Sequence, residues 1–398
     1  TRRSSDLIDT TLSNTITNCT ITLNQQINSF SDGGGIRVFA GNVTLKNTIV
    51  INNVGQVATG GSPSDITGTV SASSSFNLIG TGGSGGLTNG TNGNQVGVSV
   101  ANALLGTLGN YGGTTQTIPL LPGSPAINVG TSTGAPTADQ RGIARVGNVD
   151  IGAFESRGFT LAIASGNNQS AVTNTAFASP LSVTVSSANS EPVNGGRVTF
   201  APPGSGASCT LATNPTTIAS GTASSNATAN TAIGGPYNVS AAASGATSVN
   251  FSLTNLNSAP TFTPATALSR QQGSTAGAAV TVGTVADAQT AAASLTVTQI
   301  AGGTATGISV TGIVNPNGTV SAVVTAGCSA TSGTVRFQVS DGSLTGTGDL
   351  QVNVTANTAP SVTYAAASVN AGGSTSNSPT TATDNGSITG YAVQSQGT

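Results

Sequence analysis

The sequence predicts an all-β protein in which a short right-handed parallel β-helix end is followed by tandem Ig-like β-sandwiches. Composition is the first indication: 36% of the 398 residues are hydrophobic and only 6% are charged, while helix-forming Lys, Glu and Met are rare or absent. The second is an Asn-bounded strand pattern that repeats near the N-terminus. The third is the remainder of the chain, where short alternating strand patterns are separated by Gly, Pro and Asn.

Two segments near the N-terminus share one pattern. NTITNCTITLN (14–24) and NVTLKNTIVIN (42–52) align at an offset of 28 residues and share their outer Asn residues. A repeat of this length cannot bury its apolar side alone, so copies stack, as in a parallel β-solenoid. We therefore expect the two segments to pair in parallel within a right-handed coil whose interior includes Ile21, Leu23, Ile49 and Ile51. An antiparallel sandwich with chance Asn spacing is the alternative.

Longer motifs follow the repeats in a fixed order. They are SFNLIG (75–80), NYGGTTQTIPLLPGSPAINVG (110–130) and DQRGIARVGNVDIGAFE (139–155). In order and spacing these motifs resemble the last rungs and closing segment of secreted bacterial right-handed parallel β-helix proteins of the choice-of-anchor type. The resemblance implies that residues 1–157 are terminal β-helix rungs with a closing segment, and it carries over no catalytic residue.

The rest of the chain is modular. Residues 158–256 contain short alternating strands over roughly a hundred residues, the rhythm of an Ig-like domain. NSAPTFT (257–263) recurs as NTAPSVT (357–363), which predicts one module over 257–356 and a partial second copy over 357–398. The N-x-A-P junctions resemble those of bacterial cadherin-like repeats. We expect short linkers near Arg157 and Asn257.

Charged residues concentrate in one segment. Residues 139–157 hold six of the 22 charged residues of the chain. The last rung of a solenoid exposes unpaired strand-edge groups, which terminal segments normally cover. A Gly-rich segment with three acids and three bases suits this role because its charges neutralise one another. We interpret five of its residues as a structural closure, namely Asp139, Arg141, Arg145, Asp150 and Glu155.

Catalysis is the competing interpretation, because parallel β-helices also carry polysaccharide lyases and glycosidases that use clustered carboxylates or a basic side chain. Such sites lie in the groove along the middle rungs, where this chain has only Asp32, Arg37, Lys46 and Asp65. The chain contains no His, the commonest general base and metal ligand. We therefore expect no enzyme activity and no catalytic residue in this chain.

Calcium is the cofactor to consider, because the cadherin-like resemblance implies carboxylate ligands at module junctions. The candidates are Asp287, Asp341, Asp349 and Asp384, but the dense acidic motifs of calcium-binding repeats are missing. Asp341 in VSDGS is better interpreted as a hairpin-turn residue. We expect no cofactor, with one weak calcium site as the alternative.

Composition also limits the partners. Ten basic residues are spread over the whole length and the net charge is -2, so no stripe could neutralise the phosphates of a nucleic acid. No apolar run is long enough to span a membrane, and the first twenty residues contain no apolar signal-peptide segment. Cys19, Cys209 and Cys328 lie in different modules, and we expect them to be small buried hydrophobic residues.

These features predict a non-enzymatic extracellular structural protein that forms a stalk or fibre on the cell surface or in the matrix. An adhesin that binds surface glycans or proteins through module loops is the alternative, although aromatic residues are few. The third hypothesis is the non-catalytic part of a β-helix polysaccharide lyase or hydrolase. If the copy from residue 357 ends in the protein where this sequence ends, we expect strands around Val362 to Val369 and Ile388 to Val393 to add head to tail to a second copy of this chain. If the chain is longer, we expect its following residues to cover the same surfaces.

Overall fold

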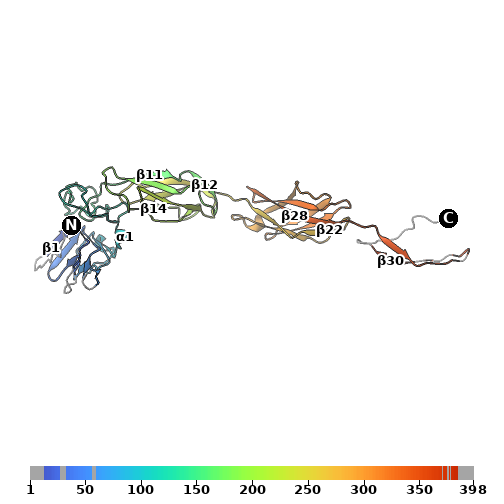
Figure 1. The fold of residues 1–398 in the computed structure, drawn as a ribbon, viewed down its shortest axis with the longest axis horizontal. Helices are drawn as coiled ribbons and strands as arrows, with labels where there is room; N and C mark the ends of the chain where they lie inside the picture. The colour runs from blue at the N-terminus through green and yellow to red at the C-terminus, as the bar shows by residue number, and fades with distance from the viewer. Residues whose placement is uncertain are drawn as a thin grey trace. The chain divides into compact units, whose positions relative to one another are not determined.

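The computed structural model describes residues 13–26, 33–55, 60–369, 371–373, 376 and 378–383. Strands account for 43% of the chain and helices for 3%, which confirms the all-β fold class. The chain divides into two compact units, Thr1–Leu256 and Asn257–Thr398. Figure 1 labels elements of both units.

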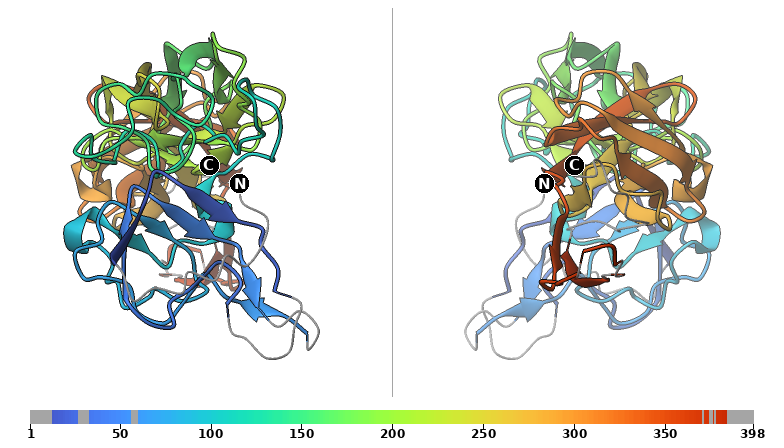
Figure 2. Two further views of the ribbon diagram at one scale, coloured as in Figure 1. Left: turned by 90° about the vertical axis from the view of Figure 1, so that its left-hand side faces the viewer. Right: turned by 90° about the vertical axis from the view of Figure 1, so that its right-hand side faces the viewer.

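The first unit begins with strands that pair in parallel. β1 (Ser13–Thr17) pairs with β4 (Asn42–Lys46), and β2 (Thr20–Thr22) pairs with β5 (Ile49–Ile51), which confirms parallel pairing of the two repeated segments. We call residues 13–98 the parallel stack; its strands run from blue to cyan in Figure 2. Its other strands are β3 (Ile36–Arg37), β6 (Val54–Gly55), β7 (Ser62–Pro63), β8 (Ile66–Thr67), β9 (Leu78–Ile79) and β10 (Gln95–Val96), with a 3-10 helix at Thr91–Gly93 and α1 (Val100–Ala103) directly after the stack.

The order of strands in the main sheet of the stack is the same as their order along the chain. β2, β5, β9 and β10 are successive neighbours in one parallel sheet, and β3 pairs in parallel with β8. β6 and β7 form a small antiparallel pair. Each turn of the chain therefore adds one strand to the same sheet.

The repeat is one residue longer than the sequence alignment indicated. Thr20 lies opposite Ile49, and the side chains of Asn18 and Asn47, which are 29 residues apart, are hydrogen-bonded. Both Asn residues have positive φ, 50° and 47°, at the corner before their strands. Asn adopts this left-handed conformation more readily than most residues. The corner Asn pair, rather than the outer Asn residues of the motif, thus sets the register.

Successive side chains of a strand point to opposite faces, so a shift of one residue changes which residues of the two repeats share a face. Val50 packs in the interior of the stack with Val43 and Leu45, whereas Ile49 and Ile51 belong to a second core that extends from the stack into the following parts of the first unit. The assignment of Ile49 and Ile51 to the interior of the coil is therefore wrong, although both side chains are fully buried.

The two predicted interior residues of the first repeat also differ from expectation. Ile21 packs against the interior of the stack but is only partly buried. Leu23 is 58% exposed and has a φ of 60°, opposite Asn52 with a φ of 58°. Its assignment to the interior is wrong, because the chain turns a corner at this position.

A β-sandwich follows within the first unit. One sheet has the order β11-β13-β17 and the other β12-β20-β19-β14-β16, with a separate pair β15-β18. All pairs are antiparallel except β12 with β20. The strands are β11 (Thr160–Ser165), β12 (Gln169–Val172), β13 (Leu181–Ser186), β14 (Arg197–Ala201), β15 (Cys209–Leu211), β16 (Thr216–Thr217), β17 (Thr222–Ser225), β18 (Ala227–Ala229), β19 (Gly234–Ala242) and β20 (Val249–Leu256).

One hydrophobic core runs from the stack into this sandwich. It contains Leu78 of the stack, Phe154 of the charged segment and Leu253 of β20. A backbone hydrogen bond from Arg197 N–H of β14 to the carbonyl of Pro122 (2.8 Å) joins the sandwich to the stretch that precedes the closing segment. A separate module over 158–256 remains a prediction, which limited proteolysis near residue 157 tests.

The second unit contains a sandwich of two four-stranded sheets, ordered β21-β23-β26-β25 and β22-β28-β27-β24. Phe262 and Phe337 stack in its core with ring centroids 5.0 Å apart. Its elements are β21 (Thr261–Pro264), β22 (Leu268–Gln271), β23 (Val280–Ala286), a 3-10 helix at Ala292–Ser294, β24 (Thr296–Ile300), β25 (Ile308–Val314), β26 (Thr319–Ala326), β27 (Gly333–Ser340) and β28 (Thr345–Thr355).

A hairpin after this sandwich repeats its first strand pair. β29 (Ser361–Tyr364) pairs antiparallel with β30 (Pro379–Thr383), and Val362 faces Ala382 as Phe262 faces Val285. Val362 is 37% exposed, whereas Phe262 is buried. The region around Ile388 to Val393 lies outside the described residues, so strand addition by this copy remains a prediction.

The three cysteines have different environments. Cys209 is buried and Cys19 is partly buried. Cys328 is exposed, so the expectation that all three are buried is wrong for this residue.

Candidate functional site: the charged closing segment

The closing segment, residues 126–157, packs along the side of the stack. Asn47 is fully buried and donates from Nδ2 to the carbonyl of Thr131 (2.7 Å), while its Oδ1 accepts the N–H of Thr131 (2.9 Å). Gly152 N–H donates to the carbonyl of Asn47 (2.8 Å), and Ala153 N–H donates to Thr20 Oγ1 (3.0 Å). Asn47, between β4 and β5, therefore contacts the closing segment near its start and near its end.

Gly152 is the point of closest approach. A Cβ at this position would lie 2.8 Å from both Ile49 Cδ1 and Thr20 Oγ1, and the backbone φ is 107°. Only Gly fits both conditions without strain. The closing segment thus covers a side face of the stack at β2 and β5, whereas the sequence interpretation placed it over the strand edge of the last rung. In that last rung, the Val96 N–H is satisfied by Asn89 Oδ1 (2.9 Å).

Asp139 and Arg141 form a buried ion pair at the start of the charged motif. Arg141 Nη2 lies 2.8 Å from Asp139 Oδ2, and the two side chains are 4% and 0% exposed. Asp139 also accepts the N–H groups of Arg141 (2.8 Å), Ile143 (3.0 Å) and Glu155 (3.0 Å). The Arg141 guanidinium carbon lies 3.5 Å from the centroid of the Phe154 ring. This pair therefore fastens the turn at 139–143 to the end of the motif.

Arg145 and Glu155 form a second buried pair. Arg145 Nη1 lies 2.8 Å from Glu155 Oε2, each side chain is 2% exposed, and Nη2 donates to the carbonyl of Gly152 (2.8 Å). Glu155 further accepts the N–H groups of Asp150 (3.0 Å) and Val146 (3.3 Å). Arg145 Nε has no hydrogen-bond partner among the described residues. The pair is thus enclosed by backbone groups of its own segment.

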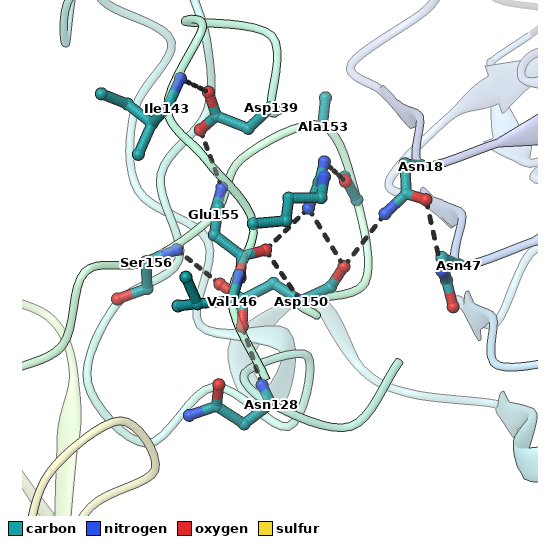
Figure 3. A network of polar contacts seen from close by, with 12 residues as sticks. Asn18, Asn47, Asn128, Asp139, Ile143, Val146, Asp150, Ala153, Glu155 and Ser156 are labelled. Atoms are coloured by element: carbon teal, nitrogen blue, oxygen red, sulfur yellow. Dashed lines mark hydrogen bonds and ion pairs between the residues drawn. The ribbon is translucent and has the colours of Figure 1, made fainter. Parts of the chain in front are cut away.

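Asp150 forms hydrogen bonds with residues at three separate positions in the sequence. Its Oδ1 accepts the Asn128 N–H (2.7 Å) and its Oδ2 accepts the Ser156 N–H, while its carbonyl accepts Asn18 Nδ2 (3.3 Å), as Figure 3 shows. The residue is fully buried. Burial raises the pKa of Asp150 to about 7 and the neighbouring Glu155 adds to this effect, although the two N–H donors oppose it.

Glu191 completes the cluster, and sequence reasoning missed it. It lies in the loop between β13 and β14, and its carboxylate accepts Ser156 Oγ–H (3.1 Å) and the N–H of Arg157 (3.0 Å). Arg141 Nη1 is 3.6 Å away. Burial raises the pKa of Glu191. One signal was present in the sequence, because Glu155 and Glu191 are the only two glutamates of the chain.

The structure therefore brings all five predicted closure residues into one buried cluster. Each carboxylate is occupied by N–H groups or a guanidinium of the fold. A cavity of about 730 Å³ lies between the first strands of the stack and the closing segment, and Asp139 and Arg145 contribute to its lining. Asp139 is the single carboxylic residue among the described residues that line this cavity, whereas glycoside hydrolysis uses a pair. The arrangement is suited to holding chain segments together.

The calcium candidates lie apart from this cluster, in the second unit, and the three that are described accept hydrogen bonds locally. Asp287 accepts the N–H of Thr290 (2.7 Å), and Asp341 accepts that of Leu344 (2.7 Å), which lowers the pKa of Asp341. Asp349 pairs with Arg336 (2.7 Å), whose hydrogen bond lowers the pKa of Asp349. Within the described ranges, no three acidic or Cys side chains form a group that could hold a metal ion. Asp384 lies outside the described residues.

We expect Asn47→Ala to lower the free energy of unfolding of the first unit by about 2 kcal/mol, because it leaves the N–H and C=O of Thr131 without partners. Asn24→Ala is the matched control, since within the described residues the side chain of this partly buried Asn bonds only to Asn53 Oδ1 (2.9 Å). Urea unfolding of the full chain, followed by hydrogen exchange of first-unit amides, measures both. Equal losses for the two variants would contradict the role assigned to Asn47.

Comparison with known proteins gives fold-level likeness alone. No protein-family model matches the chain, and a search of curated proteins finds no relative. Among solved structures, domains 5 and 6 of the surface-layer protein SbsC match at 16% identity and a TM-score of 0.19, covering 49% of this chain and 97% of that one. Invasin, a bacterial integrin-binding protein, matches at 19% identity and a TM-score of 0.20, covering 52% of this chain and 41% of that one.

An endo-fucoidan hydrolase of glycoside hydrolase family 107 also matches, at 16% identity and a TM-score of 0.20, covering 51% of this chain and 30% of that one. Similarity at this level does not distinguish structural proteins from enzymes. In the part of the chain that the structure describes, no helix has the length and apolarity to cross a membrane.

Proposed function

We propose that this chain is a non-enzymatic structural part of an extracellular or cell-surface protein, in which the parallel stack is the end of a right-handed parallel β-helix and the sandwiches form a stalk or fibre. The observation that carries the proposal is the internal use of the charged cluster. Asp139, Asp150 and Glu155 bind backbone N–H groups and guanidiniums inside the fold. An enzyme would instead present such groups to a substrate.

The contacts of the charged cluster support the proposed structural role. It ties the stack, the closing segment and the following sandwich together through Asn18, Asp150 and Glu191. The same parts share one hydrophobic core. Polar contacts and a common core resist separation of the stack from the sandwich, which is what a stalk requires where two modules meet.

Surface labelling of intact source cells tests this proposal. Antibodies raised against residues 158–356 are expected to label intact cells or the extracellular matrix, and the purified chain is expected to release no reducing sugar from a panel of polysaccharides. Labelling that appears only after cell lysis contradicts an extracellular location. Sugar release by the chain contradicts the non-enzymatic assignment, and retention on a glycan or protein array supports the adhesin alternative.

A further inference from the structure

The buried cluster of the closing segment contains more acids than bases. Arg141 pairs with Asp139, and Arg145 pairs with Glu155. Asp150 and Glu191 add two more buried carboxylates. Unbalanced buried charge is costly, and a carboxylate in this position reduces the cost by binding a proton.

We propose that this cluster is a pH-sensitive clasp: proton binding under mildly acidic conditions tightens the closing segment onto the stack and the sandwich, and proton loss towards neutral pH loosens it. The inference goes beyond the structural role, because it assigns a condition under which the junction changes strength.

Asp150 lies where a change of its charge affects contacts between separate segments of the chain. Its carboxylate holds Asn128 and Ser156, one near the start and one near the end of the closing segment, and its carbonyl holds Asn18 of the stack. Glu191 holds Ser156 and Arg157 from the sandwich side. A change of charge at either carboxylate therefore acts where the three parts meet.

The groups that face Asp150 determine its response. From its own segment these are Glu155, which disfavours the ionised form, and Arg145, which favours it. The stack contributes the uncharged amide of Asn18, and the sandwich contributes Glu191 through the shared contact with Ser156. The other charged groups in reach are the Asp139–Arg141 pair and the exposed Arg157, which lie on the closing segment itself.

The sign of the effect follows from the direction of the shifts. The pKa of Asp150 is raised from 3.8 to about 7 and that of Glu191 is raised as well, so the folded state binds more protons than the unfolded state between these values. Stability is therefore highest at low pH within this window, falls as pH rises from about 4 to about 7, and levels off above it. The pKa values of Asp341 and Asp349 are lowered, so their contribution changes only at more acidic pH.

Hydrogen exchange of the full chain between pH 4.5 and 8.5, corrected for the intrinsic pH dependence, tests the clasp. The amides of Asn128 and Ser156 are expected to lose protection by up to about tenfold per pH unit until pH 7, and no further above it. Asp150→Asn is expected to abolish this slope. Asp65→Asn, which alters a buried carboxylate bound to Asn53 in the stack, is the control and should retain it.

A second measurement keeps the test decisive if Asp150→Asn does not fold. Carboxyl ¹³C labelling of Asp and Glu in the unmodified chain gives titration curves for Asp150 and for the two glutamates. A midpoint near 7 for Asp150, together with falling amide protection, supports the clasp. A midpoint near 4, or a midpoint near 7 without any change in protection, overturns it.

Discussion

Replacing Arg145 with methionine is expected to lower the free energy of unfolding of the first unit by about 3–5 kcal/mol. The substitution keeps most of the buried aliphatic volume but removes the guanidinium paired with Glu155, whose side chain is 2% exposed. Among the described residues, the buried carboxylate then keeps the N–H groups of Asp150 and Val146 as its hydrogen-bond donors. Removing one partner of a buried ion pair strongly destabilises the fold, because the other charge is left buried without compensation.

The double variant Arg145→Met with Glu155→Gln separates lost charge from lost packing. It removes the unpaired carboxylate while keeping a side chain of similar size, so part of the stability is expected to return. Urea unfolding of the single and double variants, with the two units resolved by hydrogen exchange, gives the coupling between the residues. A single variant as stable as the unmodified chain would show that the pair contributes nothing to the closure.

Phe154→Ala is expected to cost a similar amount, about 3–5 kcal/mol, because the ring is 1% exposed at the centre of the core that joins the closing segment to the stack. The ring meets Tyr111 edge to face at 6.3 Å and lies under the Arg141 guanidinium. Its loss therefore leaves a cavity and also exposes the buried ion pair above it.

Phe154→Leu is the matched variant, since it keeps most of the apolar volume but removes the aromatic face. The aromatic pair contributes about 0.5–1.5 kcal/mol and a desolvated cation–π contact about 2 kcal/mol. We expect Phe154→Leu to lose about that sum and Phe154→Ala to lose more, as measured by thermal and urea unfolding. Equal stability of the two variants would contradict the importance of the cavity.

The five residues that the sequence predicts as a structural closure could be selected because their charges stand out against a chain with so few of them; their role remains a prediction. Asp139, Arg141, Arg145, Asp150 and Glu155 all lie in one buried cluster. Their geometric role was harder to predict. The segment packs on Ile49 and Ile51 at the side of the stack, and this surface is visible only once the 29-residue register is known.

The register between the two repeats could not be derived by aligning their identical residues. Aligning the outer Asn residues gives an offset of 28, whereas the left-handed corners at Asn18 and Asn47 require 29. In a strand, one residue exchanges the two faces, so this small error moved Ile49 to the wrong core. Leu23 was misplaced for a related reason, since its backbone conformation at a corner is not encoded by its hydrophobicity.

Contacts between distant segments were also beyond sequence reasoning. Glu191 lies 34 residues after Arg157, and nothing in its local pattern shows that it reaches the backbone of that residue. The shared core of stack and sandwich could not be predicted for the same reason. Alternation of apolar residues shows that one face of a strand is buried, but it does not show which segment covers that face.

The free energy of unfolding of Arg141→Ala tests most directly whether the charged segment is a structural closure. The account predicts a loss of about 3 kcal/mol or more in the first unit, because Asp139 is left buried without its partner, while Arg157→Ala, an exposed arginine of the same segment, changes little. Residues kept for catalysis are commonly held at a cost to stability, so their removal leaves the fold unchanged or more stable. An Arg141→Ala variant at least as stable as the unmodified chain would therefore contradict the account.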